Sequence, residues 1–261
     1  MTMPDQGGIG VEAEAHGNIY LMDRGLTYRL PPQVSTLPGP IQEIVRLVGV
    51  TDDAMLSRAG LSWDRYLDRH RVVYDPQSPA TRMVAERYLY DAVARSYESQ
   101  IDRERNVAVI RRLLDQVGRG WLIDYGCGTG ISLDALNPAT HHLLGVDISP
   151  SMRTIAENRG LMTVPVEALE TNTSCQFDGG FACYVLHLAS AHEHLYGLAR
   201  SIRVGGRFAA NFHKGRGMAA VDQILRSCGF EIEARREPGR SVPAPEIVWV
   251  RMAAPPVTRR S

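Results

Sequence analysis

The chain has 261 residues, enough for one or two domains with a full hydrophobic core, and its 44% hydrophobic and 22% charged residues are typical of a globular protein. Its 29 basic and 29 acidic residues give a formal net charge of zero, so composition gives no support for a polyanionic partner. The sequence shows no apolar run that could span a bilayer, no signal peptide at its start and no C-x-x-C pair among its four cysteines. We therefore expect a cytoplasmic protein with reduced thiols and without a zinc site.

Residues 1–85 are predicted to form an N-terminal accessory segment. A short hairpin with a Gly turn is expected over residues 19–30. Apolar residues at helical spacing then predict helices over 41–48, 51–60 and 62–67, so we expect the segment to be mainly helical. Its order of helices and short turns also looks a little like a helix-turn-helix.

From residue 79 onward the pattern changes to a regular alternation of helices and strands. A long helix is expected from Pro79 and another over 101–117. The strands predicted after them are 121–125, 143–147, 161–166, 181–186, 207–212, 231–236 and 247–252. This alternation predicts an α/β fold with a doubly wound sheet.

A Gly-rich turn follows the first of these strands. The strand ends at Asp124-Tyr125, three glycines follow as Gly126-x-Gly128-x-Gly130, and a helical pattern begins after them. Strand, Gly-rich turn and helix open a nucleotide-type site, because the glycines permit unusual backbone angles and place no Cβ between the chain and a ligand. The spacing differs from the G-x-G-x-x-G of dinucleotide enzymes.

An acid ends the second strand. Asp147 lies 23 residues after Asp124 and is followed by Ser149-Pro150, a preferred start for a helix. A carboxylate at this place has two oxygens that match the two hydroxyls of a ribose. The alternative interpretation is that Asp147 caps the following helix.

Together these motifs resemble those of the class I S-adenosylmethionine-dependent methyltransferases of the small-molecule type. Four further segments fit the resemblance: Tyr90 to Tyr97, Val166-Glu167-Ala168, Phe177 to Leu188, and Val204-Gly205-Gly206. The resemblance covers residues 86–253, which we expect to form the catalytic domain, with 254–261 as a tail. It implies a Rossmann-like seven-stranded sheet.

The resemblance also implies the cofactor, S-adenosylmethionine, with S-adenosylhomocysteine as product. Asp147 would bind the ribose, Ile148 would lie against the adenine, and Glu167 with the Ala168 amide would bind the adenine edge. The implied cofactor-binding residues are Tyr90, Tyr97, Asp124, Gly126, Cys127, Gly128, Gly130, Asp147, Ile148, Met152, Glu167, Ala168, Cys183 and Tyr184. No catalytic metal is expected, because Cys183-Tyr184 stands where the cation-dependent branch would place an acid.

Two histidines are the candidate catalytic residues. His187 and His213 follow the fourth and fifth strands, at the ligand side of such a sheet, and an imidazole can accept a proton near neutral pH. Alternatively, His187 packs or caps locally and His213 is a loop residue.

For the acceptor, we expect a hydrophobic or aromatic small molecule, such as one of secondary metabolism, methylated on O, N or C. The accessory segment is a candidate lid or dimer contact, and we expect neither a nucleic-acid nor a membrane partner. The alternative is an S-adenosylmethionine-binding protein with a non-methylating or regulatory role and a helix-turn-helix-like module. Mixed charges at 62–70 argue against that module binding phosphates.

Overall fold

The structure is a computed structural model, and it describes residues 20–23, 26–29, 62–67, 70–74, 76–77, 79–171, 177–239 and 242–252. The chain divides into two compact units, Met1–Val93 and Ala94–Ser261. Helix α3 (Pro79–Val93) continues through residue 85, and the domain boundary expected there stays a prediction. The helices expected over 41–60 and the tail 254–261 lie outside the described residues.

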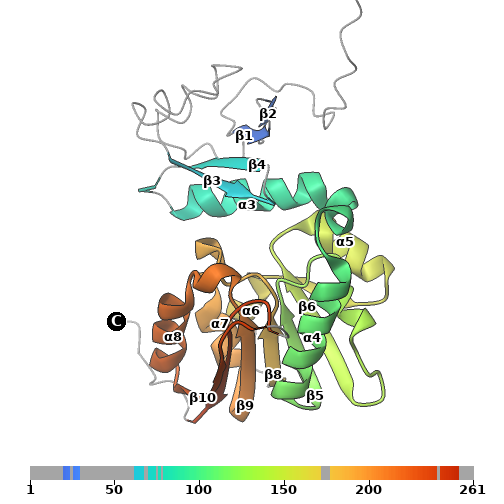
Figure 1. The fold of residues 1–261 in the computed structure, drawn as a ribbon, viewed down its shortest axis with the longest axis vertical. Coiled ribbons are helices and arrows are strands. Elements are labelled where there is room, and N and C mark those ends of the chain that lie inside the picture. Colours follow the sequence, from blue (N-terminus) through green and yellow to red (C-terminus); the bar gives the residue numbers. More distant parts are fainter. Residues whose placement is uncertain are drawn as a thin grey trace, which may run out of the picture. The chain divides into compact units, whose positions relative to one another are not determined.

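Within its described residues, the N-terminal unit contains a four-stranded antiparallel sheet in the order β2-β1-β4-β3, followed by α3 (Figure 1). Its strands are β1 (Tyr20–Asp23), β2 (Leu26–Arg29), β3 (Ser62–Tyr66) and β4 (His70–Tyr74). The predicted hairpin is present, with Tyr20 opposite Arg29.

The helix expected over 62–67 is wrong, because these residues form β3 and pair with β4. Asp64 and Tyr66 are two residues apart, so their side chains lie on the same face of the strand. Both accept a hydrogen bond from Arg82 of α3. The would-be reading helix of a helix-turn-helix is therefore a strand, and the described part of the segment is not mainly helical.

The second unit contains the predicted doubly wound sheet, with seven strands among the described residues in the order β10-β11-β9-β8-β5-β6-β7. Neighbouring strands from β9 to β7 run parallel, and β11 runs antiparallel to both β9 and β10. The strands are β5 (Gly120–Tyr125), β6 (His141–Asp147), β7 (Met162–Pro165), β8 (Phe177–Ala182), β9 (Ile202–Asn211), β10 (Phe230–Arg236) and β11 (Glu246–Arg251).

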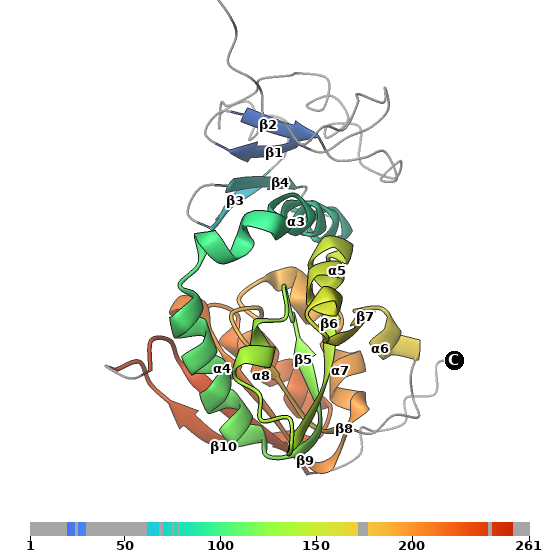
Figure 2. The same cartoon turned by 90° about the vertical axis from the view of Figure 1, so that its right-hand side faces the viewer.

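Helices cover both faces of this sheet. Figure 2 shows α4 on the left of the strands and α7 on the right. One layer contains α4 (Arg103–Val117), the 3₁₀ helix η3 (Ile131–Asp134) and α5 (Pro150–Asn158). The other contains α6 (Ala168–Thr171), α7 (Leu195–Ser201) and α8 (Met218–Ser227). Shorter 3₁₀ helices are η2 (Ala94–Gln100), η4 (Ala189–His192) and η5 (His213–Gly215).

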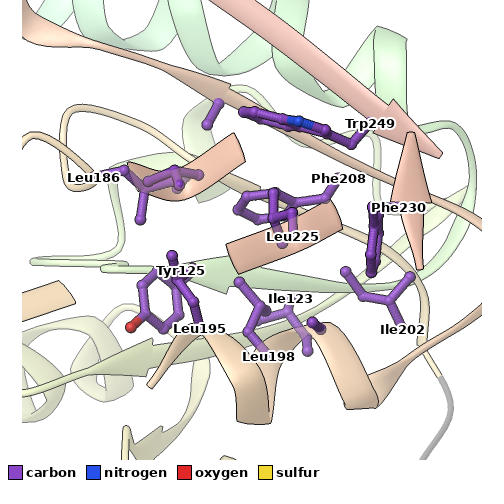
Figure 3. Close-up of a cluster of buried hydrophobic side chains, with 14 of the residues drawn as sticks. Ile123, Tyr125, Leu186, Leu195, Leu198, Ile202, Phe208, Leu225, Phe230 and Trp249 are labelled. Atoms are coloured by element: carbon purple, nitrogen blue, oxygen red, sulfur yellow. The ribbon is translucent and has the colours of Figure 1, made fainter. Parts of the chain in front are cut away.

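Alternating side chains along the strands supply both layers of the core. Leu122 packs in the cluster beneath α4, whereas its neighbour Ile123 packs in the cluster beneath α7 and α8. In β9, Phe208 and Ala209 divide in the same way, as the two-residue period of a strand requires. Figure 3 shows the α7 and α8 side, where the rings of Trp249, Phe208 and Phe230 lie among aliphatic side chains.

Local sequence fixes where the main helices begin. The Asp102 carboxylate accepts a hydrogen bond from the Arg105 backbone at 3.0 Å and caps α4. The Ser149 hydroxyl accepts one from the Met152 backbone at 3.1 Å, with Pro150 as the first residue of α5, as predicted.

Among the described residues, no helix combines the length and apolar character needed to cross a membrane. The cytoplasmic location stays a prediction.

Candidate active site

The parallel strands end side by side at one edge of the second unit's sheet. Their pairing registers place these residues next to one another: Tyr125 with Val146, Asp147 with Pro165, and Ala182 with Ala210. The Gly-rich turn, Asp147, the Glu167 loop and Cys183 therefore all follow directly at this edge. In open α/β sheets, ligands bind at the carboxyl ends of the strands.

The three glycines of the turn have different environments. Gly126 has φ +75°, and a Cβ there would lie 2.2 Å from a methyl group of Val185. Gly130 has φ +77°, and its Cβ would lie 3.1 Å from that of Ala156 in α5, so this glycine lets the turn approach the helix. At Gly128, the nearest described atom to a Cβ would be on the Tyr97 ring, at 3.9 Å.

The Asp147 carboxylate is anchored by backbone donors from two loops. Its Oδ2 accepts a hydrogen bond from the Gly128 amide and its Oδ1 accepts one from the Ser149 amide, both at 2.8 Å. Arg153 also donates to the Asp147 carbonyl at 2.6 Å. A carboxylate has two oxygens, each able to accept more than one hydrogen bond, so the half-buried group suits a vicinal diol. Its capping of the Ser149 amide and a ribose-binding role are thus compatible.

Asp124, the acid before the Gly-rich turn, is only 3% exposed. Burial raises the pKa of its carboxyl, the nearby Ser132 side chain lowers it and the charge of Asp147 raises it, and together they bring it to about 7. Near neutral pH, both the protonated and the ionised form are therefore populated. A cation bound close to Asp124 would favour the ionised form.

The remaining predicted cofactor residues differ in their surroundings. Cys127 is buried beneath the turn, where its Sγ would lie 2.8 Å from a Cβ on Gly145. Met152 is 1% exposed, Ile148 and Ala168 are partly buried, and Glu167 is exposed. Tyr90 belongs to α3 in the N-terminal unit, so its predicted role is not placed against this edge. All of these contacts with a cofactor stay predictions.

The structure brings the two candidate catalytic histidines together. Their ring centroids lie 5.6 Å apart, with the planes tilted by 51°. His187 is half-buried in the loop after β8, and His213 is exposed at the start of η5, directly beyond β9. The pair lies at the same edge of the sheet as the Gly-rich turn.

Sequence reasoning missed Asn211, the last residue of β9. It is fully buried, and its Oδ1 accepts a hydrogen bond from the Tyr184 amide at 2.6 Å. Tyr184 has φ +54°, in the left-handed region, so β8 ends at Ala182 rather than at the expected residue 186. An amide within the apolar run from Phe208 to Phe212 was the signal that marked this residue.

No group of three or more His, Cys, Asp or Glu side chains that could hold a metal ion lies in the part of the chain that the structure describes. For the chain as a whole, the absence of a catalytic metal stays a prediction.

A family model described as a methyltransferase domain matches residues 123–210. The match begins in β5, takes in the Gly-rich turn and the Asp147 strand end, and finishes in β9. The seven-stranded sheet, with antiparallel β11 inserted between β9 and β10, has the class I methyltransferase fold. The chain contains a class I S-adenosylmethionine-dependent methyltransferase domain.

Three similar proteins accompany this match. The chain is 46% identical to the 18S rRNA (guanine-N(7))-methyltransferase bud23 of Schizosaccharomyces pombe over 44 residues, which are 17% of this chain and 16% of the relative. A chain from a complex of the Haloferax volcanii Trm112 methyltransferase activator is 16% identical, with 63% of this chain and 98% of that chain covered and a TM-score of 0.49. The 16S rRNA methyltransferase RsmC of T. thermophilus is 16% identical, with 59% and 40% covered and a TM-score of 0.45.

The expectation that nucleic acid is no partner is wrong. It rested on the net charge of zero and on the mixed charges at 62–70, yet 44 residues of the chain are 46% identical to an enzyme named for rRNA. Net charge describes the whole chain and does not exclude a local interaction with RNA.

Proposed function

We propose that the chain transfers the methyl group of S-adenosylmethionine to a nucleophile held at the carboxyl ends of β8 and β9. The observation that carries the proposal is the Asp147 carboxylate, fixed by the Gly128 and Ser149 amides beside the glycine turn. The residues fit the cofactor, because a rigidly held carboxylate can accept from both ribose hydroxyls. When bound, the cofactor supplies an electrophilic sulfonium methyl group.

The surrounding residues then have separate roles. Glu167 and the Ala168 amide bind the adenine edge, and Ile148 packs against the adenine face. Asp124 places a titratable carboxyl near the positively charged end of the cofactor. Fixing the donor and acceptor in line contributes about 7–11 kcal/mol to catalysis in well-oriented reactions.

The two histidines are the proposed proton acceptors. Their ring centroids lie 5.6 Å apart after the ends of β8 and β9, so an acceptor hydroxyl or ammonium beside either ring can pass its proton to an imidazole. An acceptor that is already a free nucleophile needs no base, and the histidines then only orient it.

For the acceptor, we propose a small molecule. The resemblance of the motifs from Tyr90 to Gly206 to those of small-molecule methyltransferases supports this choice. The match to bud23 favours a second candidate, a purine of an RNA. Incubation with methyl-labelled cofactor, once with a metabolite fraction and once with total RNA, separates the two. Label in the small molecules is expected, and label in RNA alone would establish the second candidate.

Asp147 gives the direct test of the cofactor assignment. Asp147→Ala should weaken the binding of S-adenosylhomocysteine at least about tenfold, the loss expected when a double hydrogen bond to a diol disappears. Isothermal titration calorimetry measures this, with Asp115→Ala on the exposed face of α4 as the control. Equal affinity of wild type and Asp147→Ala would remove the ribose role.

A further inference from the structure

A ring of ion pairs joins four elements around the Gly-rich turn. Glu98 of η2 pairs with Arg103 at 3.0 Å and with Arg159 at 2.9 Å. Asp134 of η3 pairs with the same two arginines, at 2.6 and 2.7 Å. Two acids and two arginines thus alternate in a closed ring that connects η2, the start of α4, η3 and the end of α5.

Thr129 attaches this ring to the Gly-rich turn. Its hydroxyl donates to Glu98 Oε1 at 2.8 Å, and its carbonyl accepts from Arg159 Nη1 at 3.2 Å. Thr129 is only 1% exposed, so water does not readily replace these bonds. The turn is therefore bound to Glu98 of η2 through a side chain, and to Arg159 at the end of α5 through its backbone.

Glu98 and Thr129 each follow a residue that lies at the proposed cofactor site. Glu98 follows Tyr97, and Thr129 follows Gly128. The Tyr97 ring lies 3.9 Å from the Cβ position of Gly128. Burial raises the pKa of Tyr97, so its hydroxyl stays protonated. The Tyr97 ring therefore lies beside the Gly-rich turn.

We infer that Glu98, Thr129 and Arg159 are positioning residues that hold Tyr97 over Gly128 and thereby set the affinity for the cofactor. The inference rests on the proposed function. The ring's side chains are 25–44% exposed, and ion pairs of this exposure contribute little to stability. Instead, the closed set of four ion pairs holds the Tyr97 side chain in place before the ligand arrives. This lowers the entropy cost of ordering that side chain on binding.

Thr129 offers a closely matched pair of variants. Thr129→Val keeps the shape and removes the donor, whereas Thr129→Ser keeps the donor. We expect Thr129→Val to weaken binding of S-adenosylhomocysteine about fivefold or more, and Thr129→Ser to bind as wild type does. Glu98→Gln gives the same test if Thr129→Val does not fold. Glu233→Gln breaks a comparable exposed pair with Arg207 on β9 and β10 and serves as the control.

A double-mutant cycle separates positioning from a general structural role. In a Tyr97→Ala background, Thr129→Val should cause no further loss of affinity, because the aromatic side chain that Thr129 positions is absent. Calorimetry measures affinity, and thermal unfolding measures stability in parallel.

Affinity of Thr129→Val within twofold of wild type would overturn the inference. An equal loss in the Tyr97→Ala background would overturn it too, since the effect would not pass through Tyr97. Failure of the wild type to bind would instead refute the proposed function, and this inference with it.

Discussion

At the residue scale, Asp124 links stability to pH. Its carboxyl has a pKa of about 7 in the folded chain against 3.8 without burial, so the folded state holds more protons between these values. The free energy of unfolding must then fall as pH rises from about 4 to 7 and stay lower above that. A shift of three pKa units corresponds to at most about 4 kcal/mol.

The substitution Asp124→Asn removes this titration. Its free energy of unfolding should lose the part of the pH dependence that Asp124 causes. The stability of the variant relative to wild type should therefore increase from pH 4.5 to pH 8. Urea unfolding of both proteins at the two pH values measures the difference. Parallel pH profiles would show that Asp124 is ionised throughout this range.

Two residues of the edge differ in how far the sequence reveals them. Asp147 could be predicted, because its motif and its distance from the Gly-rich turn are local features of the chain. Asn211 could not, because its partner Tyr184 becomes a neighbour only through the pairing of β8 with β9. The roles of both residues towards a ligand remain predictions.

At the element scale, substitutions at two glycines should distinguish the cost of backbone strain from the cost of steric overlap. Gly126 lies in the Gly-rich turn, and Gly118 follows α4. Gly126 and Gly118 both have positive φ, at +75° and +90°. A Cβ on Gly126 would overlap the Val185 side chain, whereas no described atom lies within 4 Å of a Cβ on Gly118. Gly118→Ala should cost about 1–3 kcal/mol for its backbone, and Gly126→Ala about 1–3 kcal/mol for overpacking in addition to its own backbone strain.

Urea unfolding of the two variants measures this difference. The double variant Gly126→Ala/Val185→Ala is the control, because a smaller side chain at 185 makes room for the new Cβ and should restore part of the loss. Equal losses at Gly126 and Gly118 would mean that Val185 moves aside without cost.

Elements were predicted well where local pattern and packing agree. Each of the seven strands predicted from residue 120 onward overlaps an observed strand, although the fourth, predicted over 181–186, is observed at Phe177–Ala182. Residues 62–67 were misread because Trp63 and Tyr66 match a helical spacing, while Asp64 and Tyr66 are placed by Arg82 of α3, which the local sequence does not reveal.

At the scale of the whole second unit, long-range contacts connect its two ends. Arg112 of α4 donates to Glu246 Oε1 at the start of β11, at 2.8 Å, across 134 residues of sequence. Gln116 donates to the other oxygen of the same carboxylate at 3.4 Å. No sequence motif marks this pair, because it exists only once β11 has inserted between β9 and β10.

The pair should be sensitive to the loss of either partner alone. Glu246 is 1% exposed, so Arg112→Met leaves a buried carboxylate without its counter-charge and should cost about 3–5 kcal/mol. Arg112→Met/Glu246→Gln removes both charges and should recover most of that loss. Urea unfolding measures both, and Arg207→Met, which breaks an exposed pair with Glu233, should cost at most about 1 kcal/mol.

The effect should also reach the cofactor edge. Glu246 lies beside Asn211 in the register of β11 and β9, and Asn211 holds the Tyr184 amide. Arg112→Met should therefore weaken S-adenosylhomocysteine binding in the fraction that remains folded, and the double variant should restore it. If the double variant were as unstable as Arg112→Met, neutralising Glu246 would not have restored any stability. The arginine would then stabilise the fold through the packing of its aliphatic stem and not through its charge.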